Sequence, residues 1–165
     1  MSVMKTIAIV GATEKAGTEI ATEFAGKDYR LLLISDNVEK LSILSEKLSQ
    51  KKSTAEIESI ECVKDGCWEA DIIFLAVAPE EEKMVAQMMK EVATQKIVVS
   101  LSKCDIEHQQ LQQILPYSKL VNINHVAGSK EIIIAGNDAL ANKEISDIFL
   151  GAGYHLSKDR SAINN

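Results

Sequence analysis

The chain of 165 residues contains few prolines, cysteines and aromatic residues, and it has no long hydrophobic run. Its longest apolar run, Ile72 to Ala78, has seven residues, whereas a membrane-spanning helix needs about 20. Only two prolines occur, and no Pro- or Ser-rich segment separates two parts of the chain. The sequence therefore predicts no membrane partner and a single domain over residues 1–157, followed by a tail at 158–165.

Cysteine is also scarce. The three thiols, Cys62, Cys67 and Cys104, are too few and too irregularly spaced for a disulfide framework or a zinc site. We therefore expect reduced thiols in a cytoplasmic protein, a buried structural role for Cys104, and no metal site.

Positive charge is in deficit, because 18 Lys and Arg stand against 24 Asp and Glu, which gives a net charge of −6. A domain this acidic is a poor candidate for binding nucleic acid or an anionic membrane through its overall field. We expect no nucleic-acid partner.

Short apolar runs alternate with helical patterns along the whole chain. The predicted strands are Lys5–Val10, Tyr29–Ile34, Ile57–Val63, Ile72–Val77, Lys96–Leu101, Leu120–Asn124, Glu131–Ala135 and Tyr154–Ser157. The predicted helices are Ala16–Phe24, Val38–Leu48, Asp65–Ala70, Glu80–Thr94, Asp105–Leu115 and Ala139–Leu150. Strands that are apolar on both faces and separated by helices predict a single doubly wound α/β domain, with a mainly parallel sheet and helices on both faces.

Several side chains have expected places within these elements. We expect Trp68 to anchor the short third helix. Met84, Met88 and Met89 recur at helical spacing and are expected to fill the core. The run Glu80–Glu82 is expected to be a solvated first helical turn.

A small-residue turn joins the first strand to the first helix. It consists of Gly11, Ala12, Thr13, Glu14, Lys15, Ala16 and Gly17. Such a turn can hold a pyrophosphate on its backbone N–H groups and on the helix dipole. Glu14 stands where a nucleotide-binding turn normally has its central glycine, and Lys15 can offset part of that negative charge. A tight turn without any ligand is the alternative interpretation.

The second predicted strand ends at Ser35 and Asp36. Asp36 lies 19 residues beyond Gly17, a placement typical of the acid that holds the adenosine ribose of NAD. A carboxylate there disfavours the 2′-phosphate of NADP. Glu39 follows three residues later, so a capping box that opens the next helix is an equally good explanation of Asp36.

Together these segments resemble the nucleotide-binding domain of the deazaflavin-dependent NADP oxidoreductase and pyrroline-5-carboxylate reductase group. The segments that carry the resemblance are Thr6–Thr13, Ser35–Leu41, Glu69–Pro79, Val121–Val126, and Ile134–Gly136 through Leu150–Tyr154. The resemblance implies a Rossmann-like fold, a cofactor path along Ala76, Val77 and Ala78, and Asn124 near the nicotinamide. Glu14 and Asp36 depart from the NADP-using pattern, and relatives continue into a helical domain near the point where this sequence stops.

These observations favour a nicotinamide-dinucleotide-binding, oxidoreductase-like protein. We expect a stand-alone cofactor domain that forms a homo-oligomer and binds dinucleotide weakly, NAD better than NADP. A degenerate, non-enzymatic Rossmann domain that acts as a scaffold or redox-state sensor is the main alternative; a domain for another ligand, such as a nucleotide sugar or an acyl group, is a third. The sequence assigns no catalytic residue. His125 could touch a nicotinamide or a carbonyl, or could be a solvated loop side chain.

Overall fold

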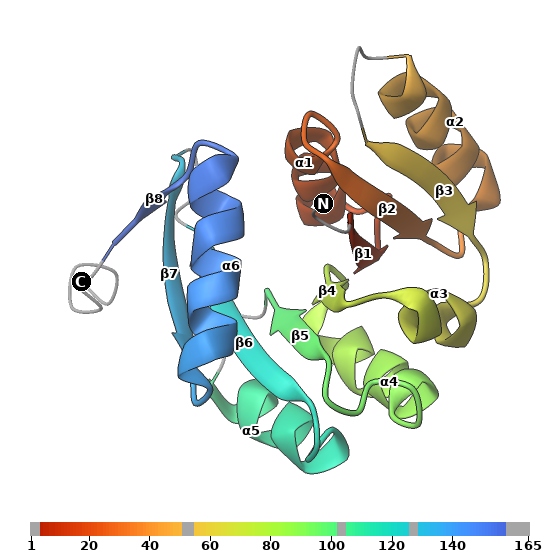
Figure 1. The fold of residues 1–165 in the computed structure, drawn as a ribbon. Helices are drawn as coiled ribbons and strands as arrows, with labels where there is room; N and C mark the ends of the chain where they lie inside the picture. Colours follow the sequence, from red (N-terminus) through yellow and green to blue (C-terminus); the bar gives the residue numbers. More distant parts are fainter. Residues whose placement is uncertain (1–3, 51–54, 102–104, 126–128, 158–165) are drawn as a thin grey trace.

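The computed structural model describes residues 4–50, 55–101, 105–125 and 129–157, without the side chains of residues 105–108. The expectations for Cys104 and for the tail at 158–165 lie outside these residues. Within them, eight strands form one sheet in the order β3-β2-β1-β4-β5-β6-β7-β8 (Figure 1).

The strands of this sheet are mainly parallel. They are β1 (Lys5–Val10), β2 (Tyr29–Ile34), β3 (Glu56–Ile60), β4 (Ile72–Leu75), β5 (Ile97–Ser100), β6 (Lys119–His125), β7 (Glu131–Gly136) and β8 (His155–Leu156). Strands β1 to β6 run in one direction, and β7 and β8 run opposite to them. The predicted α/β class and the mainly parallel sheet are confirmed.

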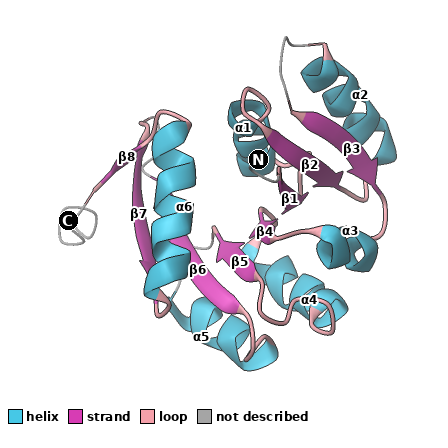
Figure 2. Cartoon of the chain, in the orientation of Figure 1, coloured by secondary structure: helices cyan, strands magenta, loops and turns pink. Residues whose placement is uncertain are grey.

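Helices cover both faces of the sheet (Figure 2). They are α1 (Lys15–Phe24), α2 (Val38–Ser49), α3 (Val63–Glu69), α4 (Pro79–Met89), α5 (Asp105–Ile114) and α6 (Ala139–Gly151). Buried residues of α1, α2 and α6 belong to one hydrophobic cluster, and those of α3, α4 and α5 belong to a second. Each cluster contains alternate residues of the same strands, as a sheet buried on both faces requires.

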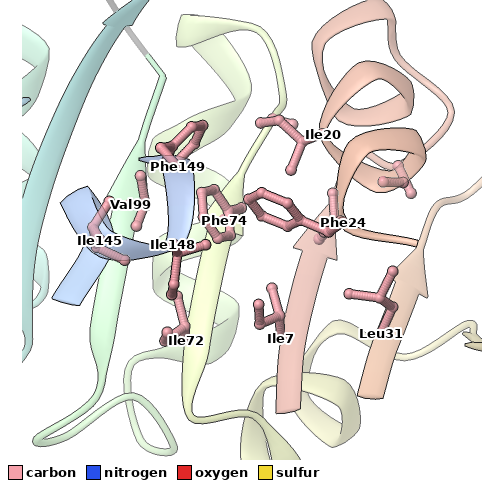
Figure 3. Packing of buried hydrophobic residues seen from close by; sticks show 14 of the residues in the cluster. Ile7, Ile20, Phe24, Leu31, Ile72, Phe74, Val99, Ile145, Ile148 and Phe149 are labelled. Atoms are coloured by element: carbon pink, nitrogen blue, oxygen red, sulfur yellow. The ribbon is translucent and has the colours of Figure 1, made fainter. Parts of the chain in front are cut away.

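Three phenylalanines form the centre of the first cluster (Figure 3). Phe24 of α1, Phe74 of β4 and Phe149 of α6 have ring centroids 5.5–6.0 Å apart. Tilted and edge-to-face contacts of this kind stabilise aromatic pairs by more than the burial of their apolar surface area alone. The trio fixes α1 and α6 against the middle of the sheet, and so fixes the amino end of α1 above the carboxyl end of β1.

The strand order places a topological switch point between β1 and β4, and we call the carboxyl edge of the sheet at this point the β1–β4 crevice. The chain leaves β1 for α1 on one face and leaves β4 for α4 on the other, although the two strands are neighbours. The N–H of Ala76 donates to the Val10 carbonyl oxygen at 2.8 Å, so the strand pairing continues to this edge. In doubly wound sheets, ligands bind at this switch point.

The third helix and the elements around it differ from the prediction. Strand β3 ends at Ile60 and α3 begins at Val63, because the polar residues Glu61 and Cys62 are exposed between them. Trp68 is not an anchor, since its side chain is 69% exposed. Gly66 and Cys67 are the buried residues of α3. Gly66 lets the helix approach Ile34, whose Cδ1 would lie 2.5 Å from an added Cβ.

The fourth helix also corrects two expectations. It ends at Met89 rather than Thr94, and only Met89 of its three methionines is buried, because Met84 and Met88 are 61% and 50% exposed. Glu82 is 2% exposed rather than solvated. Its Oε1 accepts a 2.6 Å hydrogen bond from the Ser100 hydroxyl at the end of β5. The triple-glutamate pattern did not show that one of its members faces the sheet.

Candidate functional site at the carboxyl edge of the sheet

Two glycines allow the turn after β1 to fold tightly. Gly11 has a φ of +85°, and a Cβ on it would lie 2.5 Å from the carbonyl oxygen of Ala76. A Cβ on Gly17 would overlap the carbonyl oxygen of Gly11. The turn therefore packs its backbone closely against both the end of β4 and the first turn of α1, which glycines at these two positions allow.

The backbone N–H groups of the turn divide into two sets. Those of Gly11 and Ala12 donate to the Ile34 carbonyl oxygen at 2.9 and 3.1 Å. Those of Lys15, Ala16 and Gly17 open α1 and have no acceptor within the residues that the structure describes. Three unpaired donors at the positive end of a helix form a suitable place for an anion.

Glu14 occupies the N-cap of α1 without capping it. Its backbone is extended (φ −75°, ψ 161°), and its side chain makes no hydrogen bond to the helix. The exposed carboxylate therefore adds negative charge beside the three free N–H groups.

A pocket of about 240 Å³ lies beside the turn, on the α3 and α4 face. Four carboxylates line it and no lysine or arginine does; we call it the acidic pocket. Its lining residues are Val10, Gly11, Glu14, Ile34, Ser35, Asp36, Glu61, Val63, Val77, Glu81, Met84, Val85 and Met88. The two exposed methionines that were expected in the core form part of its wall.

The predicted ribose-side residues come together at the end of β2. The hydroxyl oxygens of Thr13 and Ser35 lie 2.6 Å apart, and the Ser35 oxygen also accepts from the Asn37 N–H at 3.1 Å. Asn37, not Asp36, caps α2, since its Oδ1 accepts from the Lys40 N–H at 3.0 Å. The capping explanation of Asp36 is wrong. Its carboxylate is exposed, with no hydrogen-bond partner among the described residues.

The remaining predicted residues lie along the same edge but do not share one cavity. Ala76 is buried against Gly11, Val77 lines the acidic pocket, and Ala78 is the exposed N-cap of α4. Asn124 is half-buried near the end of β6 and lines neither the acidic pocket nor the hollows beside α1. The adjacent His125 lines both hollows beside α1.

Sequence reasoning missed several residues of the acidic pocket, namely Glu61, Val63, Glu81, Met84 and Met88. Glu61 directly follows β3 and Glu81 lies in the first turn of α4, so both positions belong to the carboxyl edge once the strand order is known. In the sequence, only their position near the end of a predicted strand could have indicated that they belong to this site.

Other possible centres are not supported in the described part of the chain. No group of three or more His, Cys, Asp and Glu side chains among those residues could hold a metal ion. None of the described helices is long and apolar enough to cross a membrane. A larger hollow of about 660 Å³ lies at the opposite edge, between the starts of β1 and β2 and α6, and is remote from the glycine turn.

Comparisons with known proteins agree with this arrangement. Residues 6–103 match the family model described as NADP oxidoreductase, coenzyme F420-dependent. A protein of Arthrobacter sp. FB24 described as an F420-dependent NADP reductase shares the fold with a TM-score of 0.71 and 14% identity, over 93% of this chain and 83% of that one. No curated protein sequence matches the chain significantly.

Two longer enzymes also share the fold. Pyrroline-5-carboxylate reductase of Coxiella burnetii has a TM-score of 0.74 and 17% identity, over 96% of this chain. Prephenate dehydrogenase of A. aeolicus has a TM-score of 0.75 and 15% identity, over 94% of this chain. The chain spans 60% of each of these two proteins. The family match and the fold support an NAD(P)-binding, oxidoreductase-type domain. Since the family model covers more than half of the sequence, the chain belongs to the family of coenzyme F420-dependent NADP oxidoreductases.

Proposed function

We propose that the chain binds a nicotinamide dinucleotide at the β1–β4 crevice and acts as the cofactor-binding part of an oxidoreductase. The observation that carries the proposal is the set of free N–H groups of Lys15, Ala16 and Gly17, which open α1 beside the crevice. These donors fit the pyrophosphate of a dinucleotide. When bound, such a cofactor supplies or accepts a hydride, and the chain's own residues bind and orient it.

The acidic pocket fits the adenosine end. Asp36 is free to accept hydrogen bonds from ribose hydroxyls, because Asn37 and not Asp36 caps α2. Met84 and Met88 offer exposed apolar surface to a purine ring. The Thr13–Ser35 hydrogen bond fixes the glycine turn against the end of β2, and thus fixes the pyrophosphate donors relative to Asp36.

Charge favours NAD over NADP in this pocket. Glu14, Asp36, Glu61 and Glu81 all line it, without a basic side chain to receive a 2′-phosphate. Two unit charges about 4 Å apart interact by about 4 kcal/mol at an effective dielectric constant of 20. A single such repulsion is enough to abolish useful affinity for NADP, whereas NAD carries no charge at that position.

The same argument makes binding of any dinucleotide weak. The Glu14 carboxylate stands beside the N–H groups that would hold the pyrophosphate, and Lys15, the next residue, is the nearest basic residue in sequence. On the nicotinamide side, Ala76, Ala78 and Asn124 stay as predicted lining residues at the ends of β4 and β6.

Two further features belong to this proposal. The free thiols of Cys62 and Cys67 support a cytoplasmic location, where reductants keep cysteines reduced. The exposed leucines Leu140, Leu150 and Leu156, on α6 and β8, support a homo-oligomer that covers them. A hydrodynamic mass near 36 kDa, about twice the 18.1 kDa of the chain, is expected at micromolar concentration, and a mass near 18 kDa would exclude the oligomer.

Calorimetric titration with NADH tests the function. We expect weak, saturable binding to the wild type, and about tenfold tighter binding to Glu14→Gly and Glu14→Gln, since tenfold corresponds to about 1.4 kcal/mol of relieved repulsion. Glu80→Gln is the matched control, because the Glu80 side chain is exposed and does not line the pocket. If the Glu14 variants bound NADH no more tightly than Glu80→Gln does, the pyrophosphate would not bind at this turn.

The position of Glu14 also favours a second candidate, a Rossmann domain that has lost its cofactor and serves as a scaffold. In that case none of NAD, NADH, NADP and NADPH binds the wild type at millimolar concentration. Binding restored in Glu14→Gly alone would then identify the glutamate as the cause of the loss.

A further inference from the structure

Two adjoining hollows lie on the α1 and α6 face, opposite to the face that carries the acidic pocket. One is an apolar pocket of about 200 Å³ whose walls include Ile20, Leu101, Ile123, Ile132 and Phe149. The other is a polar groove of about 430 Å³ whose walls include Thr18, Thr22, Glu23, Ser129 and Lys130. Glu19, His125 and Tyr154 line both, so the two hollows form one site with an apolar end and a polar mouth.

The apolar end has room for one ring-sized group. Its aromatic wall is a T-shaped pair, Phe149 and Tyr154, with ring centroids 5.0 Å apart. His125 packs edge-on against Tyr154 at 6.1 Å. An added ring can contact the free surface of such a cluster in the same geometry.

A hydrogen bond fixes the tautomer of His125. Its Nε2 lies 2.6 Å from the carbonyl oxygen of Ser129, which can only accept, so Nε2 carries a hydrogen and donates it. In the neutral ring Nδ1 then has a lone pair. Nδ1 has no partner within the described chain, and His125 lines both hollows. The site therefore offers an acceptor to a ligand that carries an N–H or O–H group.

The charged side chains around the mouth, Glu19, Glu23 and Lys130, favour a cation or a neutral ligand over an anion. Lys130 is already engaged, since its Nζ lies 2.6 Å from Glu23 and 4.7 Å from the centre of the Tyr154 ring. Glu19 has no ion-pair partner among the described residues.

We propose that this site binds the second reactant of the oxidoreductase, a compound with a ring-sized apolar group and an ammonium or hydroxyl group. The ammonium or hydroxyl donates to Nδ1 of His125, and Glu19 neutralises the ammonium. Calling this ligand a reactant rests on the proposed function, whereas its chemical class follows from the site alone. Ala16 connects this ligand site with the proposed dinucleotide site. It lines the apolar pocket, and its N–H is one of the three that would hold the pyrophosphate.

Three matched probes test the ligand class: benzylamine, benzyl alcohol and benzoate, each titrated to millimolar concentration and followed by NMR chemical shifts of the full chain. We expect saturable binding in the order benzylamine, benzyl alcohol, benzoate. Equal or tighter binding of benzoate, or no binding of any probe, would overturn the proposal.

Two variants separate the roles of the side chains. His125→Gln keeps an N–H donor for Ser129 and removes the Nδ1 acceptor, so binding of benzylamine and of benzyl alcohol should fall about tenfold, the loss of one hydrogen bond to a charged or polar group. Glu19→Gln should weaken benzylamine about fivefold and leave benzyl alcohol unchanged. His155→Gln and Glu39→Gln are the controls, because neither residue lines the site.

A measurement on the wild type covers the case in which a variant does not fold. The ¹⁵N shifts of the His125 ring should show Nε2–H and a bare Nδ1, and benzylamine should move the Nδ1 shift. A ring protonated at Nδ1 in its neutral form would overturn the proposal. Binding of benzylamine without binding of NADH would contradict the proposed function and support the ligand site. Binding of NADH without binding of any probe would support the proposed function and contradict the ligand site.

Discussion

The hydroxyl oxygens of Thr13 and Ser35 lie 2.6 Å apart and join the glycine turn to the end of β2. Ser35 is buried and its hydroxyl oxygen also accepts from the Asn37 N–H, so it connects the turn with the cap of α2. We predict that Thr13→Val and Ser35→Ala each cost about 1 kcal/mol of unfolding free energy, with a coupling of about 0.5–1.5 kcal/mol in the double variant. Urea unfolding of the four proteins measures this coupling, and additive single effects would show that the bond contributes nothing.

Gly17 is predicted to tolerate no side chain. A Cβ there would overlap the Gly11 carbonyl oxygen, so Gly17→Ala must push α1 away from the turn, at a cost of about 3 kcal/mol. Gly151→Ala is the control, because no atom lies within 4 Å of its added Cβ and alanine favours a helix. Denaturant midpoints should fall for the first variant and stay or rise for the second. Equal denaturant midpoints for the wild type and Gly17→Ala would mean that the turn has room for a Cβ at Gly17.

Burial raises the pKa of the Cys67 thiol from 9.0 to about 12. Since the folded pKa lies above the unfolded one, the native state keeps a proton that the unfolded state loses. This contribution to stability is complete below about pH 9 and is lost as the pH rises towards 12.

We predict that the unfolding free energy falls more steeply above pH 9 in the wild type than in Cys67→Ala. Burial raises the pKa of Tyr29 and Tyr154 in both proteins, so their effect cancels in the comparison. Parallel curves would contradict the burial of Cys67.

The exposed methionines of α4 provide a test of the adenosine wall. We predict that the double variant Met84→Ser, Met88→Ser weakens NADH binding severalfold, because apolar area in the acidic pocket is lost. Its unfolding free energy should change by less than about 0.5 kcal/mol, as expected for exposed positions. Exposed Ile43, on α2 away from the pocket, supplies the control Ile43→Ser. An unchanged NADH affinity would place the adenosine elsewhere.

Much of the fold followed from sequence patterns, because strands apolar on both faces can only lie in a covered sheet. The small-residue turn between the first strand and the first helix was likewise predicted, and in the structure Gly17 packs closely against Gly11 within it. Side-chain environments that depend on which elements become neighbours were harder to predict. Glu82 and Met84 lie two residues apart on α4, yet the glutamate is buried against Ser100 and the methionine is exposed at a pocket.

The capping of α2 shows a second limit. Asp36 and Asn37 are adjacent, and either can cap a helix, so spacing alone did not distinguish them. The structure selects Asn37 because the helix begins at Val38. His125 shows a third limit, since its fixed tautomer depends on Ser129, beyond the end of β6.

The most direct test is the calorimetric comparison of NADH with NADPH on the wild type and on Asp36→Arg. The four carboxylates of the acidic pocket predict that the wild type binds NADH weakly and NADPH at least about tenfold more weakly. The arginine should reverse that order, since it replaces a carboxylate beside the 2′-position with a phosphate-binding cation. Tight NADPH binding by the wild type, or an order of affinities that Asp36→Arg does not alter, would contradict the assignment of this pocket to the adenosine ribose.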